Sequence, residues 1–447
     1  MNILERLKYG LKNGDNITRL SYLVMGAGSF LRKQYHRGIA FVSIQIIAIV
    51  YFISSGFSRI KGLRTLGTVA AGRVFDEDRG IYINTKGDNS MLFLLFGVLA
   101  VILLVVFLYL YYLNIENSIH NQELQEEGKP LKTLKEDVSD LLDGKFHITV
   151  LSIPSLLTVA FTVLPLIFMI LIAFTNFDKA HQPPGTMFTW VGFENFRVMF
   201  YESKIISGTF FALLKWTFIW AFFATFLNYI LGMLLAMLIN AKPIKMKKMW
   251  RTIFVITIAI PQFVSLLLMS KLLADQGTIN QILIKLGHTA IPFLSNPTIA
   301  KITLITVNLW VGIPYTMLIT SGILMNIPQD MYESAKIDGA TPLVQFTKIT
   351  LPYMLSVTAP YLITQFVGNF NNFNVIYLLT GGGPLTLKYH KAGHTDLLVT
   401  WLYKLTVDEK NYALASTLGI VIFAISATLS LIVFRKVTQG NKEGEFQ

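Results

Sequence analysis

The segment YESAKIDGATPLVQFTKITLP, residues Tyr332–Pro352, is a polar insert between two of the most apolar stretches of the chain. The acceptor-x-x-Glu spacing of Asp330–Glu333 is typical of a helix N-terminal capping box. Gly339 can end that helix in a left-handed conformation, and Thr341-Pro342 supplies a cap and a first-turn proline for a second helix. These signals predict a helix–turn–helix insert, which could be an ordinary connection between helices or a docking element for another protein.

The composition is that of a membrane protein. Of the 447 residues, 53% are hydrophobic and 14% are charged, and the mean hydropathy is +0.54. A soluble domain of this length would carry a far more polar surface. The net charge of +12 comes from basic residues beside apolar runs, which favours contact with anionic lipid over nucleic acid. The lack of cysteine excludes disulfides and thiol catalysis, and the histidine spacing indicates no metal site.

Apolar runs of bilayer length predict an all-α polytopic membrane protein with about eight transmembrane helices. We expect the first of them to be retained, because residues 1–37 are mixed and basic and show no signal-peptide pattern. The predicted spans are 38–57, 91–114, 148–174, 207–239, 251–273, 299–325, 353–380 and 412–435. The chain is predicted to begin with an N-terminal part (1–147) that holds two spans and an acidic linker. A six-span core (148–435) follows, which contains the insert (328–352), and a tail (436–447) ends the chain.

The distribution of lysine and arginine predicts that both termini are cytoplasmic. Basic residues gather in the N-terminal arm and again between the fourth and fifth spans, where Lys247, Lys248 and Arg251 lie. The loop after the first span is also basic and fits this orientation less well. The acidic stretch 115–147 is predicted to form a solvated helical hairpin between two membrane parts.

The spacing within the insert resembles the EAA motif of binding-protein-dependent ABC importers. That motif combines Glu-Ala-Ala, a glycine four residues later and Ile-x-Leu-Pro, and this chain has serine in place of the middle alanine. In the family, the insert is the coupling helix, which fits into a cleft on the ATPase subunit. The resemblance assigns seven residues to ATPase coupling: Glu333, Ser334, Ala335, Gly339, Ile349, Leu351 and Pro352.

The span after the insert resembles the MalF-type permease of maltose and maltodextrin importers. The similar segments are Gln365–Asn374, Leu378–Pro384 and Thr395–Val399, and the resemblance covers roughly residues 148–435. It implies an ABC importer type I permease fold and oligosaccharide import across the bacterial cytoplasmic membrane by alternating access. It also implies partners: a second permease subunit, two ATPase subunits that bind ATP-Mg, and an external sugar-binding protein. This chain lacks the GxxxxGK[ST] motif, so no cofactor and no ATP hydrolysis are expected in it.

Helical periodicity places Gln365, Asn369 and Asn372 on one face of the seventh span and Asn371 on the opposite face. Amides inside a membrane either bond between helices or face an aqueous cavity, and the sequence leaves both roles open. The resemblance favours sugar contact at Asn369 and Asn372, whereas Gln365 replaces a serine of maltose transporters. The resemblance also favours Tyr315 and Gly312 of the sixth span as site residues. In the fifth span, a proline kink makes Gln262 a further candidate.

Other functions fit the sequence less well. An ABC permease for galacto-oligosaccharides or raffinose-type sugars stays open as an alternative substrate assignment. A secondary transporter driven by an ion gradient commonly needs carboxylates or histidines within its spans, and spans four to eight hold essentially no mid-membrane acid. A membrane enzyme is disfavoured by the lack of paired carboxylates, a nucleophile elbow or a metal cluster in the sequence.

Overall fold

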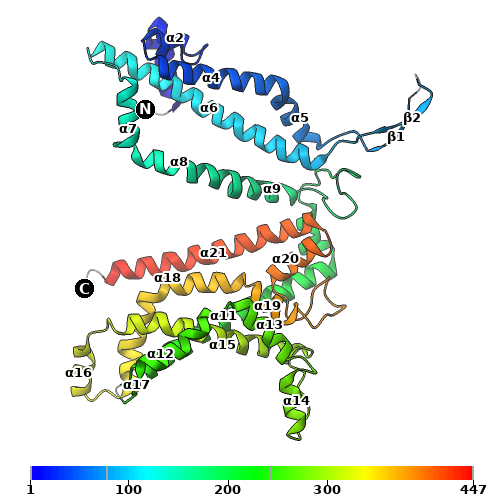
Figure 1. Cartoon of the computed structure of the whole chain (residues 1–447), viewed down its shortest axis with the longest axis vertical. Helices are drawn as coiled ribbons and strands as arrows, with labels where there is room; N and C mark the ends of the chain where they lie inside the picture. Colours follow the sequence, from blue (N-terminus) through cyan, green and yellow to red (C-terminus); the bar gives the residue numbers. More distant parts are fainter. Residues whose placement is uncertain (1–2, 77–78, 242, 445–447) are drawn as a thin grey trace. The chain divides into compact units, whose positions relative to one another are not determined.

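The computed structural model describes residues 3–76, 79–241 and 243–444 (Figure 1). Its internal contacts divide the chain into two compact units, Met1–Gly192 and Phe193–Gln447, which are described separately. Both units consist mainly of helices, which confirms the predicted all-α class. The strands β1 (Gly72–Asp76) and β2 (Ile81–Thr85) add an antiparallel hairpin to the first unit, which the sequence did not predict.

The helices of the first unit flank this hairpin in sequence. They are α1 (Ile3–Asn13), α2 (Asn16–Leu20), α3 (Ala27–Leu31), α4 (Tyr35–Tyr51), η1 (Phe52–Gly56), α5 (Phe57–Thr65), α6 (Ser90–Glu126), α7 (Leu134–Leu142), α8 (Phe146–Thr158), η2 (Val159–Val163) and α9 (Leu164–Ile172). The π-helical turns η1 and η2 join their neighbours, so that α4 to α5 and α8 to α9 each form one continuous stretch.

The N-terminal arm, α1 to α3, packs against the second half of α6. That helix has 37 residues, or about 55 Å at 1.5 Å per residue, which exceeds a hydrocarbon core of about 30 Å. The side chain of Arg32 is 1% exposed and pairs with Asp15 at 2.9 Å, and it donates to Ser118 of α6 at 3.0 Å. Arg37 hydrogen-bonds Asp137 of α7 and lowers the pKa of that carboxyl to about 2.

These contacts correct the prediction for the acidic stretch 115–147. Its first half continues α6 to Glu126, and its second half contains α7. The stretch is therefore helical as expected, but it is not fully solvated, since ion pairs from Arg6 and Arg37 hold it to the basic arm. Sequence periodicity could not reveal this, because the pairing partners lie about 100 positions apart.

The second unit contains the remaining helices. They are α10 (Glu194–Arg197), η3 (Val198–Glu202), α11 (Lys204–Asn240), α12 (Lys247–Ile256), η4 (Thr257–Ala259), α13 (Gln262–Leu272), α14 (Thr278–Lys285), α15 (Pro297–Leu324), α16 (Gln329–Ile337), α17 (Pro342–Gln345), η5 (Phe346–Thr350), α18 (Leu351–Phe370), α19 (Asn374–Thr380), α20 (Leu398–Val407) and α21 (Tyr412–Gly444). The long helix α11 is central and packs against both α15 and α18, while α18 and α20 pack against α21. Trp220 and Trp401 are fully buried in this core.

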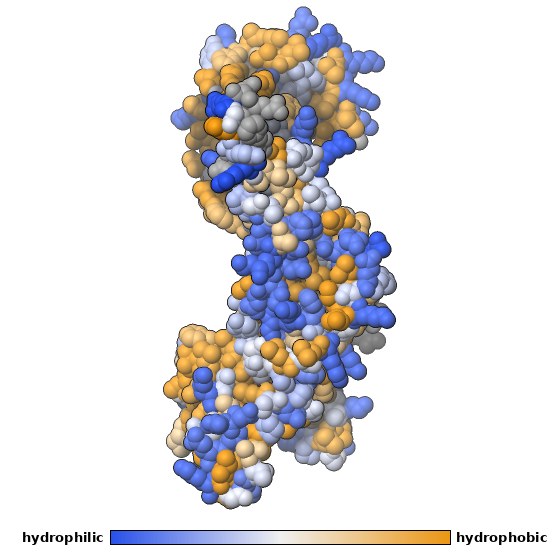
Figure 2. All heavy atoms as spheres, turned by 90° about the vertical axis from the view of Figure 1, so that its right-hand side faces the viewer, coloured by the Kyte–Doolittle hydropathy of each residue, from blue (hydrophilic) through white to orange (hydrophobic). Residues whose placement is uncertain are grey.

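Six helical stretches in the described part of the chain are long and apolar enough to cross a membrane. They are Tyr35–Thr65, Ser90–Glu126, Phe146–Ile172, Lys204–Asn240, Pro297–Leu324 and Tyr412–Arg435, and they match six of the predicted spans. Figure 2 shows large hydrophobic areas on the face in view, with patches of hydrophilic side chains between them. The chain is therefore a multi-pass membrane protein.

The fifth and seventh predicted spans are not single straight helices. The fifth is a pair, Lys247–Ala259 and Gln262–Leu272, bent by 88°. Pro261 lies at the bend, where its ring prevents the helix from continuing. The seventh is interrupted between α18 and α19, where the side chain of Asn372 accepts from the backbone N–H of Val375 at 3.1 Å and so caps the new helix.

The loop between α19 and α20 is folded around a buried carboxylate. Asp396 is fully buried and accepts from the N–H of Gly393 at 2.7 Å and from Lys404 Nζ at 2.6 Å. Gly382 has φ +81°, and a Cβ there would lie 1.9 Å from Asp396 Oδ1, so only glycine fits. Thr395 donates to the carbonyl of Gly383. The segments Gly381–Pro384 and Thr395–Asp396 are thus held together in one compact loop.

Candidate functional site

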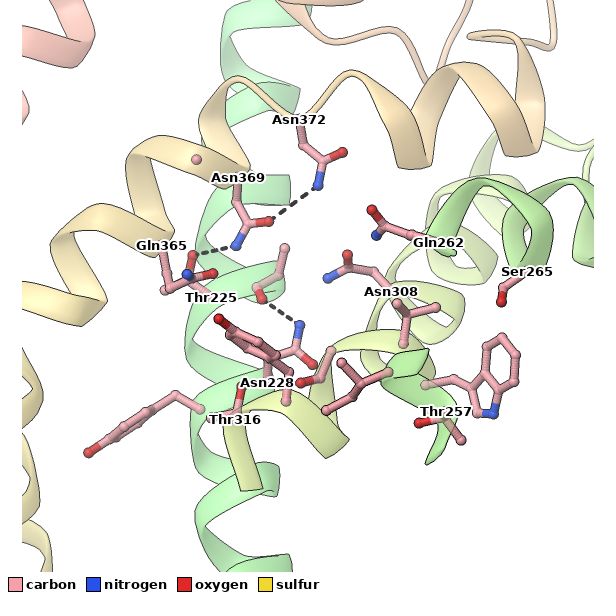
Figure 3. Close-up of a pocket in the computed structure, with 18 of the residues that line it drawn as sticks. Thr225, Asn228, Thr257, Gln262, Ser265, Asn308, Thr316, Gln365, Asn369 and Asn372 are labelled. Carbon is pink, nitrogen blue, oxygen red and sulfur yellow. Dashed lines mark hydrogen bonds between the residues drawn. The ribbon is translucent and has the colours of Figure 1, made fainter. Parts of the chain in front are cut away.

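A cavity of about 480 Å³ lies among α11, α13, α15 and α18 of the second unit (Figure 3). Its wall combines amides, hydroxyls and aromatic rings, and the described residues that line it include no acidic or basic side chain. All residues predicted to contact substrate lie on this wall: Gln262, Gly312, Tyr315, Gln365, Asn369 and Asn372. The structure therefore brings together side chains from three predicted spans, while their role in binding stays a prediction.

One wall of the cavity is a chain of hydrogen-bonded amides on α18 and in the break after it. Asn369 Nδ2 donates to Thr225 Oγ1 of α11 at 3.0 Å, and Asn372 Nδ2 donates to Asn369 Oδ1 at 3.4 Å. An amide nitrogen carries two protons and an amide oxygen two lone pairs, so each asparagine keeps unused capacity. The two roles that the sequence left open, helix–helix bonding and ligand contact, are thus compatible in this geometry.

Asn371 faces away from this wall, as the periodicity predicted. Its amide donates to the carbonyl of Val367 at 3.1 Å and to Ser426 Oγ of α21 at 3.4 Å. The position of Asn372 differs from the prediction. Asn372 reaches the cavity from the break after α18 rather than from a continuous helical face.

A second part of the cavity wall depends on the close approach of α11 and α15. A Cβ at Gly312 would lie 2.7 Å from both amide atoms of Asn228, so a larger residue there would displace this amide. Tyr315 follows on α15 with 49% of its surface exposed, which leaves its ring available to a ligand. Gln262 begins α13 directly after the Pro261 bend, and that bend directs it to the cavity.

The structure adds two site residues that sequence reasoning missed, Asn228 of α11 and Asn308 of α15. They are 8% and 6% exposed, and Asn228 Oδ1 and Asn308 Nδ2 have no hydrogen-bond partner in the part of the chain that the structure describes. Buried polar atoms are nearly always paired, so these two are poised for a ligand or water. Their sequence signal was an amide within an apolar span, as at Asn369, and Asn308 lies one helical turn before Gly312.

The polar insert forms the predicted helix–turn–helix. Gly339 has φ +78°, and the bonds Gly339 N–H to Lys336 O and Ala340 N–H to Ala335 O close a Schellman motif at the end of α16. Thr341 caps α17 through the N–H of Val344. The predicted capping box is wrong, because α16 begins at Gln329 and has no side-chain cap.

The insert presents apolar side chains that no other described part of this chain covers. Ile337 is 87% exposed, Leu343 71% and Met331 47%. The residues assigned to coupling lie on α16, in the turn, in η5 and at the start of α18. Exposed apolar residues in such number on one short segment are typical of a protein docking surface.

The fold and the cavity together define a membrane transport permease: a bundle of spanning helices with a neutral polar cavity between them and, outside the apolar runs, an insert with exposed apolar side chains. Residues 228–440 match the family described as binding-protein-dependent transport system inner membrane component. The chain belongs to this family of permeases.

Relatives agree over nearly the whole chain. The galactooligosaccharides transport system permease protein GanP of Bacillus subtilis is 36% identical over 433 residues, which cover 96% of this chain and 99% of that protein. The maltodextrin transport system permease protein MalC of Streptococcus pneumoniae is 34% identical over 427 residues, 93% of this chain and 94% of that protein. The predicted resemblance to maltodextrin permeases is thereby confirmed.

A solved structure has the same fold. A chain of a bacterial ABC transporter involved in the import of the acidic polysaccharide alginate superposes with a TM-score of 0.56 at 22% identity. The match covers 68% of this chain and 99% of that chain. It supports the ABC importer permease fold that the sequence predicted.

Proposed function

We propose that this chain is one transmembrane subunit of an ATP-driven ABC importer that carries an oligosaccharide, in the first place maltodextrin, across the bacterial cytoplasmic membrane. The observation that carries the proposal is the cavity wall, with six amide side chains and no acidic or basic side chain among the described residues that line it. Sugar hydroxyls both donate and accept hydrogen bonds, and amides serve both roles. An ion-coupled transporter would instead place ionisable groups there.

The unpaired atoms of the cavity match the donor and acceptor functions of a sugar hydroxyl. Among the described residues, no group pairs with the acceptor Asn228 Oδ1 or with the donor Asn308 Nδ2, and both are buried. Trp310 and Tyr315 add aromatic rings with 49% exposure each, which suit the apolar faces of a pyranose. Asn369 and Asn372 would supply further hydrogen bonds.

The remaining parts of the proposal concern partners. The transporter would contain a second permease subunit, two copies of an ATPase and an external sugar-binding protein, and ATP-Mg would bind only to the ATPase. Closure of the ATPase pair on ATP would move the inserts of the two permeases together and open the cavity outward. The exposed apolar residues of the insert support this docking role.

The relatives support two substrates, maltodextrin and galactooligosaccharides. Uptake of labelled maltotriose by cells that express the whole transporter, with unlabelled galactotriose as competitor, tests which one is carried. We expect maltotriose uptake with weak competition by galactotriose. Strong competition together with direct galactotriose uptake would favour the galacto-oligosaccharide alternative.

We predict that Asn228→Leu weakens substrate use without preventing assembly. The substitution keeps a similar volume but removes the unpaired acceptor Oδ1, and the loss of one such hydrogen bond typically costs about 1–3 kcal/mol. The apparent KM for uptake should therefore rise about tenfold, measured per assembled transporter. Thr217→Val, at a buried position of α11 that does not line the cavity, is the control. An unchanged KM in Asn228→Leu would remove this residue from the site.

A topological prediction tests the bent helix pair. A reporter fused after Lys247 should lie in the cytoplasm and one fused near Gly382 outside, because the α12–α13 pair, α15 and α18 would each cross the membrane once. If the two reporters lie on the same side, the bent pair is a re-entrant segment that does not cross. The proposed location of both termini is tested by reporters at each end of the chain.

A further inference from the structure

The N-terminal arm contains an apolar turn whose side chains are exposed. This arm turn, residues 20–31, connects α2 to α4 through α3. Its exposed apolar side chains include Leu20, Leu23, Val24 and Leu31, which are 39%, 75%, 45% and 56% exposed. A turn in water would be expected to carry polar residues, so this composition needs an explanation.

The backbone of the arm turn is satisfied by side chains from two spanning helices. Gln45 of α4 accepts from the N–H of Met25 at 2.8 Å and donates to the carbonyl of Leu23 at 3.1 Å. Asn114 of α6 accepts from the N–H of Gly26 at 2.8 Å and donates to the carbonyl of Ser21 at 3.0 Å.

A fifth bond completes this pattern, since Tyr111 of α6 donates from its hydroxyl to the carbonyl of Tyr22 at 2.7 Å. In water, solvent would satisfy these backbone groups without dedicated partners. In hydrocarbon, non-helical backbone is tolerated only where the protein satisfies it internally. The arrangement also explains why polar residues such as Gln45 and Asn114 occur in otherwise apolar helices.

The position of these partners places the arm turn beside the apolar part of the spans. Gln45 lies seven positions after Gly38, where the apolar run of α4 begins, which is about 10 Å along a helix. Its neighbours Ile46 and Ile49 are 55% and 47% exposed, as lipid-facing residues would be. The exposed side chains of the turn therefore continue the lipid-facing surface of α4.

Basic residues flank the arm turn on both sides. Arg19 precedes it, Lys33 follows it, and both are exposed. We propose that the arm turn inserts into the membrane leaflet on the side of the N-terminus, with Leu23 and Val24 among the acyl chains and the flanking basic residues at anionic headgroups. This inference does not depend on which substrate the permease carries.

The chain has no cysteine, so a single introduced cysteine can carry a spin label. We would label Leu23→Cys in the full-length chain, reconstituted in vesicles of phosphatidylcholine and phosphatidylglycerol, and compare collisions with oxygen and with a water-soluble nickel chelate. Ser139→Cys, at an exposed position of α7, is the aqueous control. Val24→Cys serves as a second labelling site in case Leu23→Cys does not assemble.

We expect the label at Leu23 to collide several-fold more with oxygen than with the nickel chelate, relative to the Ser139 label. Equal access of nickel to both positions would place the turn in water and overturn the proposal. A label that neither reagent reaches would also overturn it, since the turn would then be covered by protein, such as a second subunit.

Discussion

Cells that carry Gly339→Val should import oligosaccharide several-fold more slowly than wild-type cells at equal permease levels. Gly339 ends α16 with φ +78°, and a Cβ there would meet no atom within 4 Å, so the strain comes from the backbone alone. A β-branched residue in this conformation costs about 1–2 kcal/mol. If the turn changes shape to relieve this strain, the affinity of the permease for the ATPase should fall by a factor of about 5 to 30.

Two measurements separate this effect from misfolding: uptake per permease and the amount of ATPase that copurifies with the permease. Gly144→Val is the matched control, because that glycine also faces open space but does not have a positive φ. It should leave both measurements unchanged. Normal uptake and normal ATPase copurification in Gly339→Val would show that the insert does not couple to an ATPase.

Asn369→Ala and Asn372→Ala should each reduce the apparent affinity for oligosaccharide about tenfold. Each substitution removes an amide from the cavity wall and leaves sugar hydroxyls unpaired, which typically costs about 1–3 kcal/mol. Asn372 also caps α19 through the N–H of Val375, so Asn372→Ala should lower the amount of assembled transporter as well. The uptake must therefore be normalised to assembled complex.

Asn371→Ala is the control within the same segment, because its amide bonds to Ser426 away from the cavity. It should lower the amount of transporter while uptake per complex stays normal. The opposite pattern, with uptake lost in Asn371→Ala and kept in the other two variants, would mean that the sugar uses the other face. No change in any of the three would remove α18 from the site.

Local sequence signals predicted the insert well because its geometry is local. Gly339 and Thr341 each act within a few residues, and the structure has both as expected. The capping box failed because Pro328 precedes the first helical residue, so that Asp330 already lies inside the first turn. Spacing alone does not say where a helix begins.

Only part of the cavity was predictable, because periodicity shows which residues share a face of one helix. It does not show which other helix packs against that face. It identified Gln365 and Asn369 of α18, but it could not pair α11 with α15. Asn228 was therefore missed, although its contact with Gly312 shapes the wall. The break after α18 was missed for a similar reason, since the cap at Asn372 interrupts an apolar run that reads as one span.

Substrate uptake by purified transporter in vesicles tests the central claim most directly. The vesicles would contain this chain with its permease partner and ATPase, ATP would be enclosed inside, and the binding protein and labelled maltodextrin would be outside. We predict uptake that requires both ATP and the binding protein and that persists when ionophores collapse all ion gradients. Uptake that continues without ATP and stops when the ion gradients collapse would contradict this account and would favour a secondary transporter.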